Sequence, residues 1–186
     1  MRTFIAVPLN DEIHNELARL QNRLRSCGCD VKWVEPSNIH LTLKFLGEID
    51  NERLGKIKTS LSQAAGLHHP FGMRLATLGA FPKISFPQVI WVGIDEGKAE
   101  CEALYKTVQD AMAGLGFEQE KRPFSPHLTL GRLRSLKNKN KLLEVMEKEK
   151  DFACQNKVSA DRIIFFQSIL TPQGSIYTAL AEFSLV

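Results

Sequence analysis

The feature that most constrains how this chain folds is a four-residue motif that occurs twice. His40-Leu41-Thr42-Leu43 recurs as His127-Leu128-Thr129-Leu130, 87 residues later (127 − 40 = 87). The same spacing aligns Pro36 with Pro123, four residues before each histidine, without a gap. A chance match of a short motif would not align its flanks as well. The chain is therefore predicted to consist of two related halves.

Each half is predicted to be a strand–helix–strand unit. Phe4–Val7 aligns with Trp91–Ile94 as strand-like apolar runs, and Leu17 aligns with Leu104 inside two helical patterns. The predicted strands are residues 2–8, 38–46, 71–75, 89–94, 126–133, 160–170 and 175–184, and the predicted helices are residues 11–25, 51–64, 98–113 and 140–150. This order predicts an α+β fold, in which two mainly antiparallel sheets form two pseudo-symmetric lobes around a central cleft.

Some local features refine this map. The first helix places Ile13, Leu17, Leu20 and Leu24 on one apolar stripe, and Asn10 or Asp11 is its expected N-cap. Residues 80–87, which hold two prolines, are predicted to be a loop. The last two strands are predicted to form a hairpin that turns at Thr171-Pro172-Gln173-Gly174.

Composition limits the class of protein. A length of 186 residues with 44% hydrophobic and 24% charged residues suits one domain, residues 1–186, and excludes a disordered or fibrous chain. No apolar run approaches the roughly 20 residues that span a bilayer, and the apolar start of the chain ends by Asn10, so a cytoplasmic protein without membrane contact is expected. A monomer is the default expectation. The four cysteines are expected to be reduced thiols, with no metal site and no cofactor.

The repeated motif places polar side chains on one face of each strand. Because side chains alternate along a strand, His40, Thr42 and Lys44 are expected on one face, and Leu41, Leu43 and Phe45 on the core face. In the second copy, His127 and Thr129 share a face in the same way. The pseudo-symmetry suggests that the two polar faces meet in one cleft.

Two imidazoles across a cleft can serve as an acid–base pair. A neutral ring accepts a proton from a nucleophile, and a protonated ring donates one to a leaving group. Thr42 and Thr129 can donate hydrogen bonds to oxygens that gain negative charge, and Arg132 can bind a phosphate. This chemistry needs no metal and suits a phosphodiester. The net charge of +3 is compatible with transient binding of a phosphate-bearing ligand.

Structural interpretations stand beside the catalytic one. A single histidine on a strand is usually a hydrogen-bonded structural residue, and threonine is common in strands, but a matched pair in a repeat favours a functional site. Strict alternation would place Arg132 on the core face, so a bulge or strand end near Gly131 is required to bring it into the cleft. Lys44 has no counterpart at Gly131 and can equally be a solvated lysine. Phe4 and Trp91 are expected to be core residues.

The chain resembles the two-histidine phosphoesterase superfamily, and within it the RNA 2′,3′-cyclic phosphodiesterases, historically called 2′-5′ RNA ligases. The matching segments span nearly the whole chain: Arg2–Pro8, Trp33–Pro36, Asn38–Glu48, Pro87–Gly93, Arg122–Arg132 and the hairpin that holds Tyr177. The resemblance implies a bilobal fold whose two His-x-Thr motifs line a central cleft. It also implies metal-independent hydrolysis of a terminal RNA 2′,3′-cyclic phosphate to a 2′-phosphomonoester, with weak reversible 2′-5′ joining of RNA.

The resemblance also assigns roles that the near-symmetric halves leave open. By position, His40 is the proton donor to the departing 3′ oxygen and His127 is the proton acceptor that activates water. Thr42, Thr129 and Arg132 would hold the phosphate. Two other functions remain open at this point: a module that binds nucleotides or RNA ends without turnover, and an enzyme for another cyclic or 2′-5′ nucleotide, such as ADP-ribose 1″,2″-cyclic phosphate or an oligoadenylate.

Overall fold

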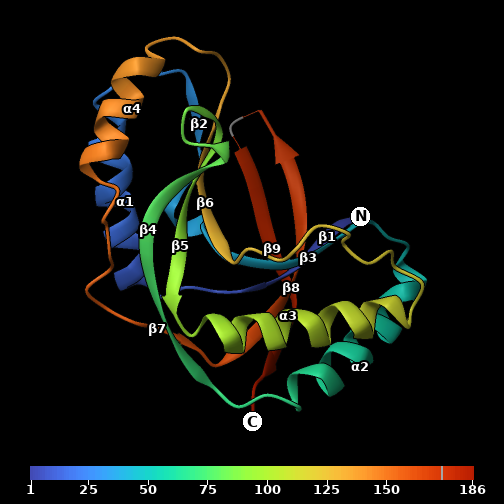
Figure 1. The fold of residues 1–186 in the computed structure, drawn as a ribbon. Coiled ribbons are helices and arrows are strands. Elements are labelled where there is room, and N and C mark those ends of the chain that lie inside the picture. Colours follow the sequence, from blue (N-terminus) through green and yellow to red (C-terminus); the bar gives the residue numbers. More distant parts are fainter. Residues whose placement is uncertain (173) are drawn as a thin grey trace.

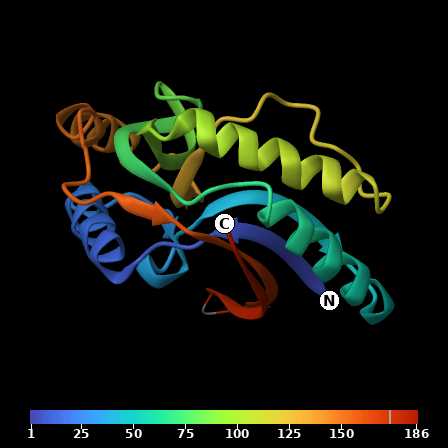
Figure 2. The same cartoon turned by 90° about the horizontal axis from the view of Figure 1, so that it is seen from below.

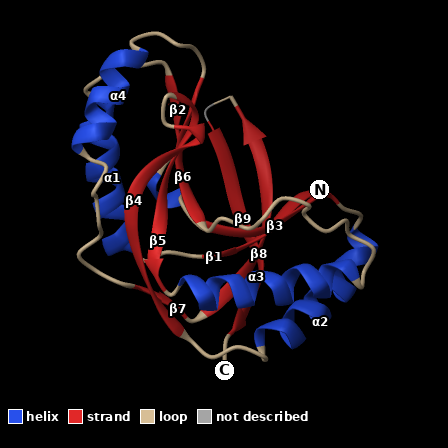
Figure 3. Cartoon of the chain, in the orientation of Figure 1, coloured by secondary structure: helices blue, strands red, loops and turns tan. Residues whose placement is uncertain are grey.

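The computed structural model describes residues 1–172 and 174–186 as four helices and nine strands (Figures 1 and 3). The strands are β1 (Arg2–Val7), β2 (Val31–Trp33), β3 (Leu41–Glu48), β4 (Phe71–Lys83), β5 (Phe86–Glu96), β6 (His127–Leu133), β7 (Val158–Ala160), β8 (Arg162–Thr171) and β9 (Gly174–Ser184). The helices are α1 (Asp11–Arg25), α2 (Leu54–Ala65), α3 (Lys98–Ala113) and α4 (Lys139–Lys148), with short 3-10 turns at Pro36–Asn38 and Asn51–Arg53.

The strands form two sheets, one for each lobe, and every described ladder is antiparallel. The first sheet has the order β3-β1-β8-β9 and the second β2-β6-β5-β4-β7. The two motif-bearing strands, β3 and β6, approach each other within 8 Å between Cα atoms. Both sheets thus pair the first strand of a half with its motif strand, β1 with β3 and β5 with β6, which confirms the predicted bilobal α+β fold.

The helices lie in two pairs on opposite sides of the sheets. Figure 2 shows α1 beside α4 at one side and α2 beside α3 at the other. Helix α1 forms where its apolar residues repeat at helical spacing, and the predicted stripe of Ile13, Leu17, Leu20 and Leu24 is fully buried. The side chain of Asn10 accepts a hydrogen bond from the amide of Ile13 at 3.0 Å, so Asn10 is the N-cap.

The predicted loop at residues 80–87 is wrong. β4 continues to Lys83 and β5 begins at Phe86, so this segment is the end of a long hairpin. Pro82 and Pro87 lie opposite each other at its tip, beside a register shift after Phe81. Proline is tolerated where a strand is irregular, because no ladder hydrogen bond depends on its missing N–H there.

Other boundaries differ from the sequence-based map by a few residues. Strand β3 begins at Leu41 rather than at residue 38, because Pro36–Asn38 form a 3-10 turn. The helix predicted for 51–64 starts with a 3-10 turn and becomes α-helical at Leu54. β2 and β7 were not predicted, since strands of three residues are too short to show a period of two.

The predicted final hairpin is present as β8 and β9. Its predicted turn includes Gln173, which lies outside the described residues. Among the described residues, no helix combines the length and the hydropathy that a membrane span requires.

Candidate active site

One large cavity lies between the two sheets and contains both histidines of the repeat. It has a volume of about 1300 Å³ and is open to solvent. It is lined by every residue that the sequence singled out as functional: His40, Thr42, His127, Thr129 and Arg132. We call this cavity the cleft. The two halves of the chain thus contribute their polar faces to one site.

The two imidazoles are held in the same way. His40 Nδ1 lies 2.7 Å from the carbonyl oxygen of Asn38, and His127 Nδ1 lies 2.7 Å from that of Ser125. A carbonyl oxygen only accepts hydrogen bonds, so Nδ1 carries the proton in each ring. Each neutral ring is therefore left with Nε2 as its acceptor nitrogen, the form that a general base requires.

Aromatic side chains surround each ring and remove it partly from water. Phe4 stacks on His40 with 4.8 Å between ring centroids, and the edge of Tyr177 meets that ring at 5.4 Å. Phe81 meets His127 edge-on at 4.8 Å. Burial lowers the pKa of His40 to about 4. Burial, together with the positive charge of Arg132, also lowers the pKa of His127 below its ordinary value. Both rings are consequently neutral at pH 7 in the free protein.

A β-bulge in β3 changes which side chains face the cleft. The ladder pairs Ala6 with Thr42 and Ile5 with Lys44, so Leu43 is an extra residue. Beyond it the alternation is reversed, so the expected core position of Phe45 is wrong, while Lys44 still lines the cleft but is buried. Phe45 is 65% exposed and lines the cleft instead of the core. Lys44 is only 5% exposed and is therefore not a solvated lysine.

Strand β6 contains the corresponding bulge. Its ladder with β5 passes from Thr129 to Gly131 and leaves Leu130 as the extra residue. Strict alternation would have placed Arg132 with Leu130 in the core, whereas the side chain is exposed and lines the cleft. The irregularity that was predicted near Gly131 is thus present. With the repeat spacing of 87, Arg132 is the counterpart of Phe45.

The alignment of the first strands of the two halves is wrong by two residues. Thr42 pairs with Ala6, whereas Thr129 pairs with Trp91, so Trp91 occupies the place of Ala6 rather than that of Phe4. A shift of two residues leaves each side chain on the same face of the sheet, and for this reason the pattern of polar and apolar residues could not reveal it. Phe4 is buried as predicted, while Trp91 is only half-buried.

Two buried glutamines support the bulges, and neither was predicted from the sequence. Gln21 on α1 donates to the Leu130 carbonyl of β6 at 2.9 Å, and Gln109 on α3 donates to the Leu43 carbonyl of β3 at 3.1 Å. Each helix thus binds the motif strand of the other half. Gln21 is 1% exposed and Gln109 is 6% exposed. We call these two bonds the cross-lobe amide contacts; a buried polar residue on an otherwise apolar helix face was the available signal.

Lys44 belongs to one of these contacts. Its ammonium group donates to Gln109 Oε1 at 2.5 Å and to the Glu118 carbonyl at 2.8 Å. Burial lowers the pKa of Lys44, and the charges of Glu118 and Glu120 oppose that shift. Lys44 therefore connects β3 to α3 and to the segment that follows it.

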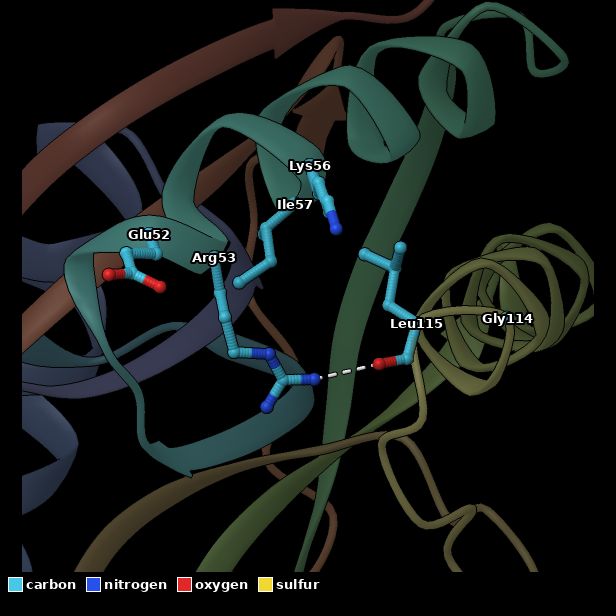
Figure 4. A pocket seen from close by; sticks show the side chains of 6 residues that line it. All are labelled: Glu52, Arg53, Lys56, Ile57, Gly114 and Leu115. Carbon is cyan, nitrogen blue, oxygen red and sulfur yellow. Dashed lines mark hydrogen bonds between the residues drawn. The ribbon is translucent and has the colours of Figure 1, made fainter.

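A smaller pocket of about 350 Å³ lies between α2 and the end of α3 (Figure 4). Neither histidine of the repeat lines it. Its central cation, Arg53, donates to the Leu115 carbonyl at 2.7 Å and lies 3.9 Å above the Phe117 ring. These bonds already use the guanidinium as a structural link. In residues 1–172 and 174–186, no three His, Cys, Asp or Glu side chains are grouped so as to hold a metal ion.

Comparisons with known proteins agree with this geometry. The LigT like Phosphoesterase family model matches the chain twice, over residues 7–91 and 92–177, one match in each half. The RNA 2′,3′-cyclic phosphodiesterase of Methanocaldococcus jannaschii is 35% identical over 182 residues, which cover 98% of this chain and 99% of that protein. That of Thermotoga maritima is 33% identical over 98% of this chain and 94% of its own length.

Solved structures show the same fold. A protein of Thermus thermophilus superposes with a TM-score of 0.77 at 29% identity, covering 100% of this chain and 98% of the other. LigT of E. coli in its apo form has a TM-score of 0.71 at 22% identity, over 98% and 96% of the two chains, and shares the fold. Two family matches that together span most of the sequence, one for each His-x-Thr motif, establish that this chain belongs to the LigT-like phosphoesterase family.

Proposed function

We propose that this protein hydrolyses the terminal 2′,3′-cyclic phosphate of RNA to a 2′-phosphomonoester, without a metal ion, by two-histidine acid–base catalysis. The observation that carries the proposal is the matched pair of imidazoles: each donates Nδ1–H to a backbone carbonyl and both line one cleft. The relatives named RNA 2′,3′-cyclic phosphodiesterases, similar to this chain over nearly its full length, support the choice of substrate.

In the proposed reaction, His127 Nε2 accepts a proton from water, and the water oxygen forms a bond to phosphorus. The bond from phosphorus to the 3′ oxygen breaks, and His40 Nε2–H donates a proton to that oxygen. The phosphate stays attached at the 2′ oxygen. Thr42, Thr129 and Arg132 hold the other phosphate oxygens, whose negative charge increases in the transition state. With the 5′ hydroxyl of a second RNA in place of water, the same steps would join the two RNA ends through a 2′-5′ bond, and that reaction is reversible.

Protonation of His40 needs the substrate. With a pKa of about 4, the protonated ring is a stronger acid than an ordinary imidazolium, but the ring is rarely protonated at neutral pH in the free protein. The negative charge of a phosphate beside the ring stabilises its charged form and raises that pKa. Binding of substrate thus prepares the proton donor, and once protonated His40 releases its proton readily to the poor leaving group.

The test uses a short RNA that ends in a 2′,3′-cyclic phosphate, with EDTA in the buffer. We expect a product that has gained one water and carries a 2′-phosphate, identified by mass spectrometry and comparison with authentic 2′- and 3′-phosphate standards. Binding without turnover would favour a nucleotide-binding module. Turnover of ADP-ribose 1″,2″-cyclic phosphate or of an oligoadenylate, but not of this RNA, would favour the other cyclic nucleotide chemistry. A strict requirement for added metal would contradict the proposed mechanism.

A further inference from the structure

Three cations gather where β2 pairs with β6. Lys32 lies directly opposite Arg132 in the antiparallel ladder, and Arg134 is the first residue after the end of β6. All three side chains are exposed. Like charges directly opposite each other on two strands destabilise the pairing unless something neutralises them. We call Lys32, Arg132 and Arg134 the cationic track.

The carboxylates of the described residues leave the track without a partner. Among the ion pairs of residues 1–172 and 174–186, none involves Lys32, Arg132 or Arg134. The cleft does contain carboxylates, but two of them have partners of their own: Glu118 pairs with Lys121 at 3.1 Å, and Glu120 with Arg122 at 3.3 Å. The local balance of charge on the β2–β6 side of the cleft is therefore positive.

The third carboxylate of the cleft lies toward the opposite end of β2. Glu35 lies two residues after Trp33, which pairs with Gly131. At the other end of β2, Val31 pairs with Leu133. The track extends toward Leu133 and thus away from Glu35. An anion bound along the cationic track would therefore lie away from the negative charge of Glu35.

The track is continuous with the proposed catalytic centre. All three cations line the same cleft as His127 and Thr129, and the charge of Arg132 reaches the ring of His127, where it contributes to lowering the pKa. The backbone N–H of Arg134 donates to the Asp30 carbonyl at 2.9 Å, so the pairing continues one residue past β6. Residues two apart on such an extended chain are roughly 6.6 Å apart. That spacing is close to the distance between successive phosphates of an extended nucleic-acid strand, so the track can follow a polynucleotide backbone.

The packing of β2 on β6 is close, which fixes the track. A Cβ atom on Gly131 would lie 2.7 Å from a methyl group of Val31 and 3.0 Å from the Trp33 ring. Glycine at this position therefore lets β2 approach β6. The guanidinium of Arg25, on α1, lies over the Trp33 ring of β2, 5.3 Å from the ring centroid. Lys32 is thus presented from a strand that contacts both β6 and α1.

We propose that the cationic track binds the backbone phosphates of the nucleotides that precede the cyclic end, so that the substrate is an oligonucleotide rather than a mononucleotide. This inference rests on the proposed function. With the cyclic phosphate between the two histidines, the RNA chain leaves the catalytic centre along β6 toward Leu133. Arg132 contacts the terminal phosphate, while Lys32 and Arg134 contact the phosphates that precede it.

The test compares a nucleoside 2′,3′-cyclic monophosphate with a four-nucleotide RNA that has the same terminal nucleotide and a cyclic end. The wild-type protein should have a higher kcat/KM for the longer substrate. In the double variant Lys32→Ala, Arg134→Ala, the ratio of the two kcat/KM values should fall toward one. The salt dependence of log(kcat/KM) for the longer RNA should become shallower by about 0.7 for each phosphate that the variant no longer binds.

A matched control carries the same loss of charge elsewhere. Lys106 on α3 and Lys148 on α4 are exposed and do not line the cleft. The variant Lys106→Ala, Lys148→Ala should keep the wild-type ratio and salt slope. Equal kcat/KM for the two substrates in the wild-type protein, or an equal decrease in the track and control variants, would overturn the inference.

Failure of the proposed function gives a different pattern. If the wild-type protein hydrolyses neither substrate, the acid–base proposal fails, and the track is then tested by binding alone. In a fluorescence anisotropy titration, a labelled four-nucleotide RNA with a 2′-phosphate end should bind more weakly to the track variant than to the control variant. Equal binding to both variants would reject the track independently of catalysis.

Discussion

The two motif strands have the same backbone conformation but differ in their neighbouring strands. β3 is the edge of its sheet, whereas β6 lies between β5 and β2. Both hold an imidazole through a carbonyl two residues earlier, and both bulge at the second leucine of the motif. At the matched positions after the bulge, β3 presents Phe45 to the cleft and β6 presents Arg132. The shared part suits proton transfer, and the part that differs suits recognition of an asymmetric substrate.

The largest effect should come from the shared part. We expect His40→Ala and His127→Ala each to lower kcat/KM for a cyclic-phosphate RNA by about 100- to 10,000-fold, because each removes one proton-transfer step. The double variant should be little worse than either single one, since the rings act as a unit. Steady-state kinetics give these values, and thermal unfolding checks that the variants are folded. A small effect in one of the single variants would show that the halves are not equivalent in catalysis.

Arg132 and Phe45 test the part that differs. Arg132→Ala should lower kcat by about 100-fold, because the phosphate then lacks a charged donor. Phe45→Ala should raise KM by about tenfold if the exposed ring stacks on a base, a contact worth roughly 1–3 kcal/mol. Phe45→Trp should retain the wild-type KM. Raising the salt concentration should weaken the contribution of Arg132 and leave that of Phe45 unchanged, and a reversed salt dependence would contradict the comparison.

The cross-lobe amide contacts should matter mainly for stability. Gln109→Leu leaves the buried Lys44 ammonium without one acceptor and should lower the free energy of unfolding by about 2–3 kcal/mol. Gln21→Leu removes bonds to the Val34 and Leu130 carbonyls only and should lower it by about 1–2 kcal/mol. Urea unfolding measures both.

A second substitution separates the charge from the packing. Adding Lys44→Met to Gln109→Leu should recover part of the stability, because no buried charge then remains without its partner. If Gln21→Leu proved the more destabilising of the two glutamine variants, the contrast between a charged and an uncharged contact would be wrong.

The pH dependence is the smallest predicted effect. Catalysis needs His127 neutral and His40 protonated, so activity falls below the pKa of His127 and above that of His40. In the free protein the pKa of His40 is about 4, and that of His127 lies below 6.5. The maximum of kcat/KM lies midway between the two pKa values and is therefore expected well below pH 6.5.

The profile of kcat reports the substrate complex and should differ. Bound phosphate raises the pKa of both rings, so the maximum of kcat should lie at higher pH than that of kcat/KM. Identical maxima for the two profiles would show that bound substrate does not change the protonation of the rings.

The sequence by itself determined the two-half design, the α+β class and the pair of histidines. These follow from short-range patterns: the repeated motif, the apolar stripe of α1 and the alternation of the strands. The cap at Asn10 and the burial of Phe4 were predictable for the same reason. Local propensity and periodicity act over a few residues, and in a repeat the same local pattern occurs in both halves and supports the same prediction twice.

Only the tertiary structure decided which side chains after each motif reach the cleft. A bulge depends on pairing with a strand far away in the sequence, so the reversal that exposes Phe45 and buries Lys44 has no local signal. The exchange of contacts between halves, through Gln21 and Gln109, is equally non-local. The same holds for the pairing of β2 with β6, which brings Lys32 opposite Arg132. The sequence fixes the identity of each residue, but the register between distant strands decides which other residues it contacts.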